Sequence, residues 1–428
     1  MIAILGAGLS GLSAAYHLKE QHCVVYEREA AVGGLCRSYR HGPFTFDYTG
    51  HLLHLRDASI RRFVSELLPS GLALHGRQAA IYSQGVYTPY PFQVHLYGLP
   101  QETIQECLEG FMEAMRRPTS RDNLRDWILS TFGPGIARHF LFPYNQKLWR
   151  TDLSRLSIDW VGWAVPRPSL EEVIQGAQGK AQGWYGYNAT FLYPQDGGIG
   201  LLAEALADRI PEVHLGKEAV EIQARKKRLT FQDGSSGSYE RLISTLPLPE
   251  LLNRITDLPA AIQEAGKGLR YVSVYDVNLG VGRERISDKH WIYFPEEEFA
   301  FYRVGFPMNF SASLGPPGTS SLYAEISCLP EESFSPEEAL ERVVQGLERC
   351  GILQEDDVLL AQDVQRIRYA YVIHNPDRRR LLPWIQESLE EAGIHTIGRY
   401  GGWGYSSMEE ALLEGRRVAS TVIRQAQN

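Results

Sequence analysis

A glycine motif near the N-terminus restricts this chain more than any other feature. The apolar run 1–5 predicts a buried strand, and glycines in the spacing GxGxxG follow it directly, before a helical pattern begins. A second apolar run, 23–26, ends at the acidic residue Glu27. A strand, three spaced glycines, a helix and then an acid are typical of a Rossmann-type dinucleotide-binding unit.

Each part of this motif has a physical task. Gly6 permits the tight turn, Gly8 lets the backbone approach a pyrophosphate, and Gly11 lets the helix pack closely on the strand. The first turn of the helix directs free N–H groups at the phosphates, and Glu27 can accept hydrogen bonds from a ribose diol. A glycine-rich turn in some other α/β protein is disfavoured, because strand, helix and acid all stand where the motif requires them. The cofactor-binding residues predicted here are Gly6, Gly8, Leu9, Ser10, Gly11 and Glu27.

Composition and charge exclude several classes of protein. With 428 residues, the chain predicts two or three domains. Its net charge is −8 and it has no basic run, so nucleic acid and anionic membranes are not expected as partners. No window reaches about 18 uninterrupted apolar residues, so no membrane span is expected. The five cysteines are scattered, without a CxxC pair or a Cys/His cluster, which predicts no disulfide framework, no metal site and a reduced, cytoplasmic protein.

Hydrophobic periodicity predicts how the elements follow one another. Helices are expected at 56–70, 101–140 with a break at Gly133-Pro134, 336–350 and 408–425. Strands are expected at 213–215, 219–222, 229–231, 242–246, 272–279, 291–294, 301–304, 321–326 and 394–397. We therefore expect a nucleotide-binding fold assembled from segments distant in sequence, with a helical part and a β-rich part inserted.

Several ordered segments carry a resemblance to a known family. They are Phe-Asp-x-x-Gly-His at 46–51, Pro-Tyr-Pro-Phe-Gln at 89–93, Pro-Tyr-Asn-x-Lys-x-Trp at 143–149, Lys-x-Trp-x-Tyr-Phe-Pro-Glu at 289–296, Phe-Tyr-Arg at 301–303 and Gly-Arg-Tyr-Gly-Gly-Trp-x-Tyr at 398–405. With these six segments in this order, the chain resembles the UDP-galactopyranose mutases, most closely their eukaryotic-type branch. That family belongs to the amine oxidase and protoporphyrinogen oxidase superfamily. In such flavoproteins a second glycine turn, here Gly33-Gly34, lies beside the pyrophosphate, which favours FAD over NAD.

The resemblance implies an α/β fold with a Rossmann-like FAD-binding domain of the GR2 flavoprotein type. That domain would comprise 1–75, 195–265 and 385–428, beside a helical insert at 95–190 and a β-rich substrate-binding domain at 76–94 and 266–384. The implied enzyme is an isomerase of polysaccharide biosynthesis that interconverts the pyranose and furanose rings of a nucleotide sugar, expected to be UDP-linked. It would act through an adduct between the sugar and N5 of reduced FAD (FADH−), with NAD(P)H as the external reductant.

The resemblance also assigns roles to residues. The catalytic residues would be His51, Arg303 and Arg399, and the further cofactor-binding residues Arg28, Gly34, Leu35, Gly50, His51, Val220, Gly398, Arg399, Ser407 and Met408. The substrate-binding residues would be Tyr90, Phe92, Gln93, Trp163, Arg167, Tyr293, Arg303, Tyr371 and Tyr405.

Structural alternatives stand beside several of these assignments. His51 could be an ordinary histidine at a strand end, and the segment 90–93 could consist of core and turn residues. Arg303, in an apolar and aromatic strand, either binds an anion or forms a salt bridge with Glu325 of the next strand. A planar guanidinium suits a diphosphate, which favours the first role.

Departures from the family pattern leave other readings open. A second diphosphate-binding arginine of the family aligns with Ala164, and the nearest arginine is Arg167. Thr49 stands where the family has glycine, and Glu409 where it has asparagine. The alternative function is an FAD-dependent oxidase or desaturase of the amine oxidase or protoporphyrinogen oxidase type; a third is a flavin-binding scaffold without turnover. The sequence does not decide between a monomer and a homo-oligomer.

Overall fold

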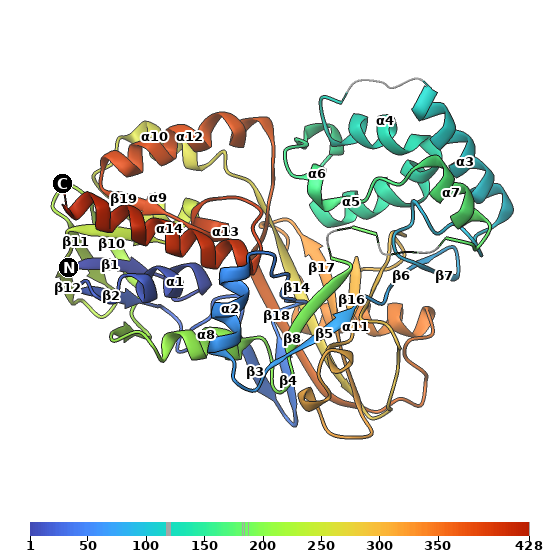
Figure 1. Cartoon of the computed structure of the whole chain (residues 1–428), viewed down its shortest axis with the longest axis horizontal. Coiled ribbons are helices and arrows are strands. Elements are labelled where there is room, and N and C mark those ends of the chain that lie inside the picture. Colours follow the sequence, from blue (N-terminus) through green and yellow to red (C-terminus); the bar gives the residue numbers. More distant parts are fainter. Residues whose placement is uncertain (117–120, 182, 184, 187, 428) are drawn as a thin grey trace.

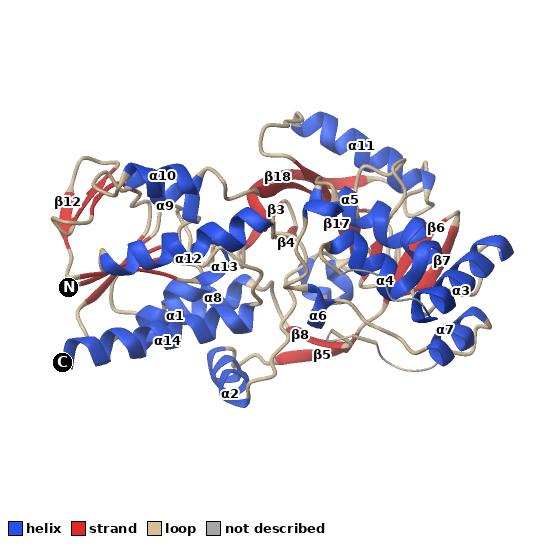
Figure 2. Ribbon diagram, turned by 90° about the horizontal axis from the view of Figure 1, so that it is seen from above, coloured by secondary structure: helices blue, strands red, loops and turns tan. Residues whose placement is uncertain are grey.

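The protein is elongated, and both termini lie at the same end of it (Figures 1 and 2). This arrangement comes from a computed structural model, which describes residues 1–116, 121–181, 183, 185–186 and 188–427. The side chains of residues 163, 164, 426 and 427 are not described.

A parallel sheet forms the end that holds the termini. Five strands of the described chain stand in the order β19-β13-β1-β2-β9. They are β1 (Ile2–Leu5), β2 (Cys23–Tyr26), β9 (Val213–His214), β13 (Arg241–Ser244) and β19 (Ile394–Thr396). Since these strands come from distant parts of the sequence, the expected Rossmann-like α/β fold with its discontinuous assembly is confirmed.

Side chains of β1 alternate between the two faces of this sheet. Ile2 and Ile4 belong to a core with helices α1 (Leu9–His17), α8 (Gly200–Ala207) and α14 (Met408–Gln427), whereas Ala3 and Leu5 belong to a core on the other face. That second core includes α9 (Leu248–Arg254), α10 (Ala260–Gly266), α12 (Pro376–Glu391) and a small sheet of β10 (Ala219–Gln223), β11 (Arg228–Phe231) and β12 (Ser236–Ser238). The strand is therefore buried on both sides, as parallel sheets usually are.

A larger mixed sheet forms the opposite end of the molecule. In the described chain its strand order is β18-β14-β17-β16-β15-β6-β7, with β15 and β6 parallel and the other neighbours antiparallel. The strands are β6 (Ala79–Ser83), β7 (Val86–Pro89), β14 (Tyr271–Val281), β15 (Trp291–Tyr293), β16 (Arg303–Gly305), β17 (Ser320–Cys328) and β18 (Leu359–Val372). Helix α11 (Pro336–Arg349) packs its apolar side against one face.

Polar side chains form a row across the other face of this sheet. The strand register pairs Tyr293 with Arg303, Arg303 with Glu325, Glu325 with Asp276, and Asp276 with Gln365. Residues paired across strands point to the same face, so one row of polar side chains crosses the sheet from β15 to β18. This row lies beneath the candidate site described below.

A group of helices covers part of the same face (Figure 1). It contains α3 (Gln101–Arg116), α4 (Leu124–Ile136), a π-helical turn (Ala137–Leu141), α5 (Phe142–Trp149), a 3₁₀ turn (Leu153–Arg155), α6 (Val161–Ala164) and α7 (Leu170–Ala177). Gly133 has φ +76°, so the predicted break at Gly133-Pro134 is a kink inside a continuing helical segment. The Lys147 ammonium donates to the carbonyls of Phe294, Glu296 and Phe301 and thereby fixes α5 to the sheet.

The remaining elements connect these parts. They are the hairpin of β3 (Ser38–His41) and β4 (Phe44–Asp47), the pair of β5 (Leu72–Gly76) and β8 (Thr190–Pro194), helices α2 (Ala58–Leu67) and α13 (Gly398–Gly401), and 3₁₀ turns at Pro307–Asn309 and Ala312–Leu314. Two long elements, β18 and α12, were not among the predicted ones. In the described part of the chain, no helix combines the length and apolarity that crossing a membrane requires.

Candidate functional site

A cavity of about 750 Å³ lies where the parallel sheet, the mixed sheet and the helical group meet. Most of the predicted site residues line it. They are Gly6, Gly8, Leu9, Ser10, Glu27, Arg28, Gly34, Leu35, Gly50, His51, Tyr293, Arg303, Tyr371, Gly398, Arg399, Tyr405, Ser407 and Met408. One continuous cavity therefore joins the glycine motif to the predicted substrate residues.

Of the three motif glycines in the turn between β1 and α1, Gly8 alone borders open space, and this is the position at which the motif needs room for a ligand. A Cβ on Gly6 would meet the Thr245 hydroxyl at 2.2 Å, and one on Gly11 would meet the Gly6 carbonyl oxygen at 2.0 Å. At Gly8, by contrast, no described atom lies within 4 Å of such a Cβ. Gly6 and Gly11 thus serve close packing, whereas Gly8 leaves the cavity open at the start of α1.

The start of α1 offers free donors to that space. No side chain caps this helix, and the N–H groups of a first helical turn have no acceptor within the helix. The second glycine turn lies alongside, because Gly33 donates from its backbone N–H to the Ala7 carbonyl at 2.8 Å. Both glycine turns thus border the same place, which suits a negatively charged pyrophosphate.

Glu27 is held by the backbone on both of its carboxylate oxygens. Oε2 accepts the Ala7 N–H at 2.7 Å and Oε1 accepts the Glu29 N–H at 3.0 Å. Each oxygen can accept a second hydrogen bond. Because the carboxylate also lines the cavity, it can receive the hydroxyls of a ribose.

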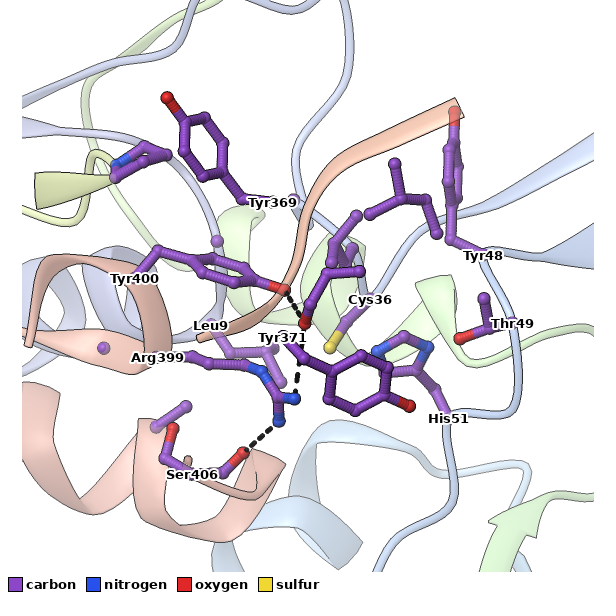
Figure 3. A pocket seen from close by; sticks show the side chains of 18 of the residues that line it. Leu9, Cys36, Tyr48, Thr49, His51, Tyr369, Tyr371, Arg399, Tyr400 and Ser406 are labelled. Carbon is purple, nitrogen blue, oxygen red and sulfur yellow. Dashed lines mark hydrogen bonds between the residues drawn. The ribbon is translucent and has the colours of Figure 1, made fainter. Parts of the chain in front are cut away.

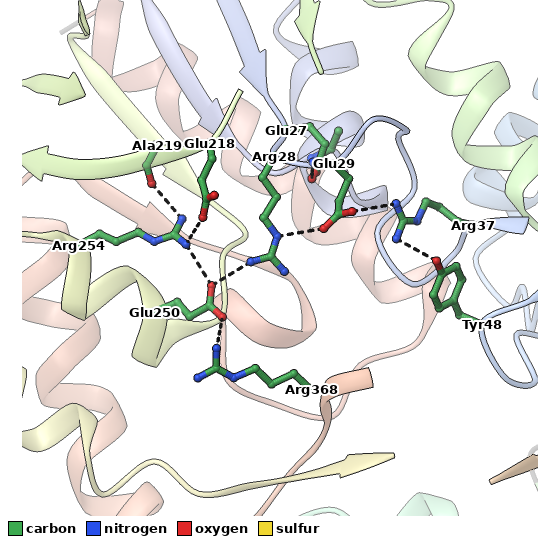
Figure 4. Close-up of polar contacts among 11 residues, drawn as sticks. Glu27, Arg28, Glu29, Arg37, Tyr48, Glu218, Ala219, Glu250, Arg254 and Arg368 are labelled. Atoms are coloured by element: carbon green, nitrogen blue, oxygen red, sulfur yellow. Dashed lines mark hydrogen bonds and ion pairs between the residues drawn. The ribbon is translucent and has the colours of Figure 1, made fainter. Parts of the chain in front are cut away.

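Ion pairs surround this end of the cavity (Figure 4). The Glu250 carboxylate forms ion pairs with Arg28, Arg254 and Arg368, with N···O distances of 3.4–3.6 Å. The Glu29 carboxylate forms ion pairs with Arg28 and Arg37. Glu218 also pairs with Arg254, at 2.7 Å. Each of the four arginines thus has a carboxylate partner, and the network of four arginines and three carboxylates fixes the walls of the cavity.

The other end of the cavity contains an arginine with no such partner. Arg399 donates to the carbonyls of Ser406 at 3.0 Å and Ala370 at 3.4 Å (Figure 3), and its guanidinium lies 4.5 Å from the centre of the Tyr405 ring and 5.4 Å from that of Tyr371. Among the described residues, no carboxylate oxygen lies within 4.0 Å of it. A cation lining a cavity in this way favours an anionic ligand.

Arg303 reaches the same region from the mixed sheet. Its Nε and Nη2 donate to the two carboxylate oxygens of Glu325 at 2.9 and 2.6 Å. The salt bridge considered as the alternative role is therefore present, and Arg303 still lines the cavity. Tyrosines from several elements stand around the two arginines: Tyr144, Tyr293, Tyr302, Tyr323, Tyr371 and Tyr405.

His51 lines the cavity together with Arg399 and Tyr371 (Figure 3). Burial lowers its pKa to about 4, and the Arg399 cation acts in the same direction. Its Nδ1 is buried and has no hydrogen-bond partner in the described part of the chain. The ring is therefore neutral near pH 7 and keeps a polar atom for a ligand.

Comparison with known proteins identifies the family. Residues 9–423 match the family model of the flavin containing amine oxidoreductases. The chain belongs to this family.

Solved structures agree with that assignment. A crystal structure of reduced UDP-galactopyranose mutase is 28% identical, with 100% of this chain and 94% of that chain covered and a TM-score of 0.94. A protein from Exiguobacterium sp. 255-15 named after protoporphyrinogen oxidase is 15% identical over 99% and 98% of the two chains, with a TM-score of 0.77. Cyclohexylamine oxidase from Brevibacterium oxydans is 15% identical over 100% and 99%, with a TM-score of 0.70; these last two show the fold alone.

The protein is thus a flavoenzyme of the amine oxidase superfamily, and FAD is the cofactor that this family implies. The residues present fit it. The open space at Gly8 with the free N–H groups of α1 suits the pyrophosphate, Glu27 suits the ribose, and the orphaned Nδ1 of buried His51 offers a polar contact to the flavin.

Some of the predicted residues of this flavoenzyme do not line this cavity in the structure. Phe92 is fully buried and stacks on Phe140 with ring centres 5.1 Å apart, inside the core of the helical group. Gln93 is 2% exposed and donates to the Pro166 carbonyl at 2.8 Å. Neither lines the cavity, because the chain after the two prolines turns into that core. In this structure both residues are therefore packed as the core-residue alternative expects.

Three further assignments are also displaced. Tyr90 stacks beneath Arg77 and lies 5.3 Å from the Tyr293 ring, one layer behind the cavity wall. Arg167 is exposed and donates to the Gly162 carbonyl at 3.4 Å, so it does not replace the missing arginine in this structure. Val220 is 43% exposed, and Ala219, on the opposite side of the strand, lines the cavity instead.

Three other positions complete the account of the predicted residues. Gly11 acts through packing and does not line the cavity. Trp163 belongs to α6, but its side chain lies outside the described residues. Glu409 is buried and accepts the N–H groups of Arg56 and Asp57, so it joins α14 to the start of α2.

The prediction missed several residues of the cavity wall. Tyr144, Trp149 and Tyr302 belong to motifs that the sequence already showed, so a signal for them existed. Tyr323 and Thr245 have no local pattern, and only the tertiary fold brings them to the cavity.

Proposed function

We propose that this flavoenzyme is a nucleotide-sugar mutase, which interconverts the pyranose and furanose rings of a UDP-linked sugar while its FAD is reduced. The ordered motifs and the likeness to reduced UDP-galactopyranose mutase, at 28% identity and a TM-score of 0.94, support this proposal. The choice of uracil as the base rests on that likeness, since Phe92 and Gln93 do not line the cavity.

One observation carries the proposal. Arg399, without a carboxylate within 4.0 Å among the described residues, and Arg303 border the same tyrosine-lined part of the cavity. Such a part suits a diphosphate, because guanidinium groups bind phosphate oxygens in pairs and tyrosine hydroxyls donate to the remaining ones.

The protein's own groups would divide the work. When bound and reduced, FAD supplies a nucleophilic nitrogen, N5, toward the anomeric carbon of the sugar. Arg399 holds the departing diphosphate and stabilises its negative charge, and Arg303, whose Nε and Nη2 are bound to Glu325, adds the donors of its Nη1. The surrounding tyrosines orient the sugar and exclude water, and neutral His51 offers a hydrogen bond without adding a charge.

An oxidase of an amine or an apolar substrate is the second candidate. The family and the aromatic wall of the cavity favour it. An ammonium substrate would be repelled by Arg399, however, by about 3 kcal/mol at 6 Å separation and an effective dielectric constant of 20. The electrostatics therefore favour the mutase.

An anaerobic assay separates the two candidates. The purified protein is reduced with dithionite and given UDP-galactopyranose or UDP-galactofuranose, and the products are resolved by chromatography. The proposal expects ring interconversion without net oxidation. Turnover of an amine with oxygen consumption, and none of either UDP-sugar, would establish the oxidase instead.

A further inference from the structure

A buried carboxyl on the mixed sheet holds the segment that carries His51. Asp276, on β14, is fully buried, and its Oδ2 accepts the backbone N–H of Thr49 at 3.0 Å and the Asn278 amide at 2.9 Å. Thr49 belongs to the segment 48–51, which follows β4 and ends at His51, and which we call the histidine segment. All of its residues line the cavity, whereas Asp276 lies behind it.

The histidine segment needs such support. Thr49 has φ +63°, in the left-handed region that a β-branched residue rarely adopts. The next residue, Gly50, lies so close to the sheet that a Cβ there would meet the Tyr323 hydroxyl at 2.2 Å. A strained residue persists only where its surroundings fix it, and the Asp276 hydrogen bond does so at the strained residue itself.

The charge state of Asp276 follows from its place in the polar row. The nearby Arg303 donates to Glu325 and forms no ion pair with Asp276. Oδ1 of Asp276 has no hydrogen-bond partner among the described residues. Burial raises the pKa of Asp276 to about 8, against the Asn278 hydrogen bond, and the Glu325 carboxylate raises it further. The carboxyl is thus neutral at pH 7.

Other titratable and charged groups also face Asp276. They are Arg303 on β16, Tyr323 on β17, Tyr39 on β3 and, through Tyr39 and Asn278, Asp363 on β18. Only Arg303 among them is a cation, and it is paired with Glu325. Ionising Asp276 therefore places a second negative charge beneath the histidine segment.

We propose that Asp276 is a positioning residue: its neutral carboxyl holds the Thr49 N–H and keeps the histidine segment at the cavity wall, and its ionisation makes FAD harder to reduce. The inference requires FAD in the cavity but not the mutase reaction. A negative charge near the flavin disfavours the reduced anion, which gives the second part its sign.

The test compares Asp276→Asn, Asp276→Ala and the wild type. Asparagine keeps an acceptor for Thr49 but does not ionise, whereas alanine removes the acceptor. Asp363→Asn is the matched control: Asp363 lies on β18, the strand next to β14, accepts hydrogen bonds from Tyr39 and Gln365, and does not contact Thr49. The first readout is exchange of the Thr49 amide in the apoprotein. We expect at least fivefold faster exchange in Asp276→Ala and wild-type exchange in Asp276→Asn and Asp363→Asn.

The second readout is the midpoint potential of bound FAD between pH 6 and 10. In the wild type and in Asp363→Asn we expect an additional fall of the potential with a midpoint near pH 8, and in Asp276→Asn none. Unchanged Thr49 exchange in Asp276→Ala would overturn the positioning role. A fall near pH 8 that persists in Asp276→Asn would overturn the electrostatic part. Because neither readout uses a sugar, failure of the mutase proposal would leave both results interpretable.

Discussion

The two ends of the cavity are built from different parts of the polypeptide. At the glycine-motif end, backbone N–H groups and the backbone-held carboxylate of Glu27 form the wall, and a short stretch of sequence supplies most of them. At the arginine end, long side chains from the helical group, the mixed sheet and the turn before α14 meet. The first end can change little without losing its shape, whereas the second can change its ligand by substituting side chains.

The comparison is tested most strongly at Arg303. Arg303→Ala leaves the Glu325 carboxylate buried and unpaired, which should lower the free energy of unfolding by about 3–5 kcal/mol. Replacing both residues, Arg303→Met with Glu325→Leu, should restore the stability because no buried charge remains. Neither variant should bind a nucleotide sugar as the wild type does, yet both should retain FAD. Urea unfolding and titration with UDP check these outcomes, and loss of FAD from the double variant would contradict the role at the arginine end.

The next prediction concerns the glycine-motif end. Gly11→Ala places a methyl group 2.0 Å from the Gly6 carbonyl oxygen, so the apoprotein should lose about 3 kcal/mol of stability. Gly8→Ala is the matched variant, because its methyl group meets open space and should leave the apoprotein stable. Gly8→Ala should instead raise the dissociation constant of FAD roughly ten- to hundredfold, because the methyl group displaces the pyrophosphate from one charge-assisted hydrogen bond. Equal stability of the two apoproteins would show that the glycines are interchangeable and the assignment is wrong.

A smaller effect is expected from substituting Phe92, and this substitution distinguishes a core residue from a residue of the cavity wall. Phe92→Leu should lower the free energy of unfolding by about 1.5 kcal/mol, since the residue is fully buried, and leave the dissociation constant of UDP within about twofold. Tyr293→Leu, on the cavity wall, should change the stability less and raise the dissociation constant of UDP at least about fivefold, because roughly one hydrogen bond to the ligand is lost. If Phe92→Leu weakened UDP binding as strongly as Tyr293→Leu, the sequence assignment of Phe92 to the substrate would stand after all.

Sequence alone predicted the glycine-motif end better than the arginine end, for a physical reason. The turn at Gly6, Gly8 and Gly11 follows from local backbone freedom, and the lining of the cavity by Gly8 and Glu27 agrees with it. The position of an aromatic side chain depends on packing between distant segments. Thus Phe92 and Tyr144 stand in equally suggestive motifs, yet only Tyr144 lines the cavity.

Missed elements have similar causes. In the edge strand β18, polar Asp363 and Gln365 stand at alternate positions between buried Ala361 and Ile367, which obscures the hydrophobic alternation of the strand. Helix α12 begins at Pro376 and contains Pro383, residues that usually mark a helix boundary. Neither Thr49 nor Asp276 shows in the sequence that they would meet, because their contact joins a loop to a strand far along the chain.

The smallest predicted effect concerns His51, which lines the cavity within the influence of Arg399. Burial, and then Arg399, lower its pKa from 6.5 to about 4, so the unfolded chain binds more protons than the folded one between these values. Its contribution to stability is therefore complete above pH 6.5 and is lost as the pH falls toward 4, by about 1 kcal/mol between pH 6.5 and 5.5. In His51→Leu this part of the pH dependence should disappear from the unfolding free energy of the apoprotein, whereas the exposed His22→Leu should keep it. An unchanged slope in His51→Leu would mean that the ring is solvated and charged more readily than its burial beside Arg399 implies, and the arginine end would then be open to water.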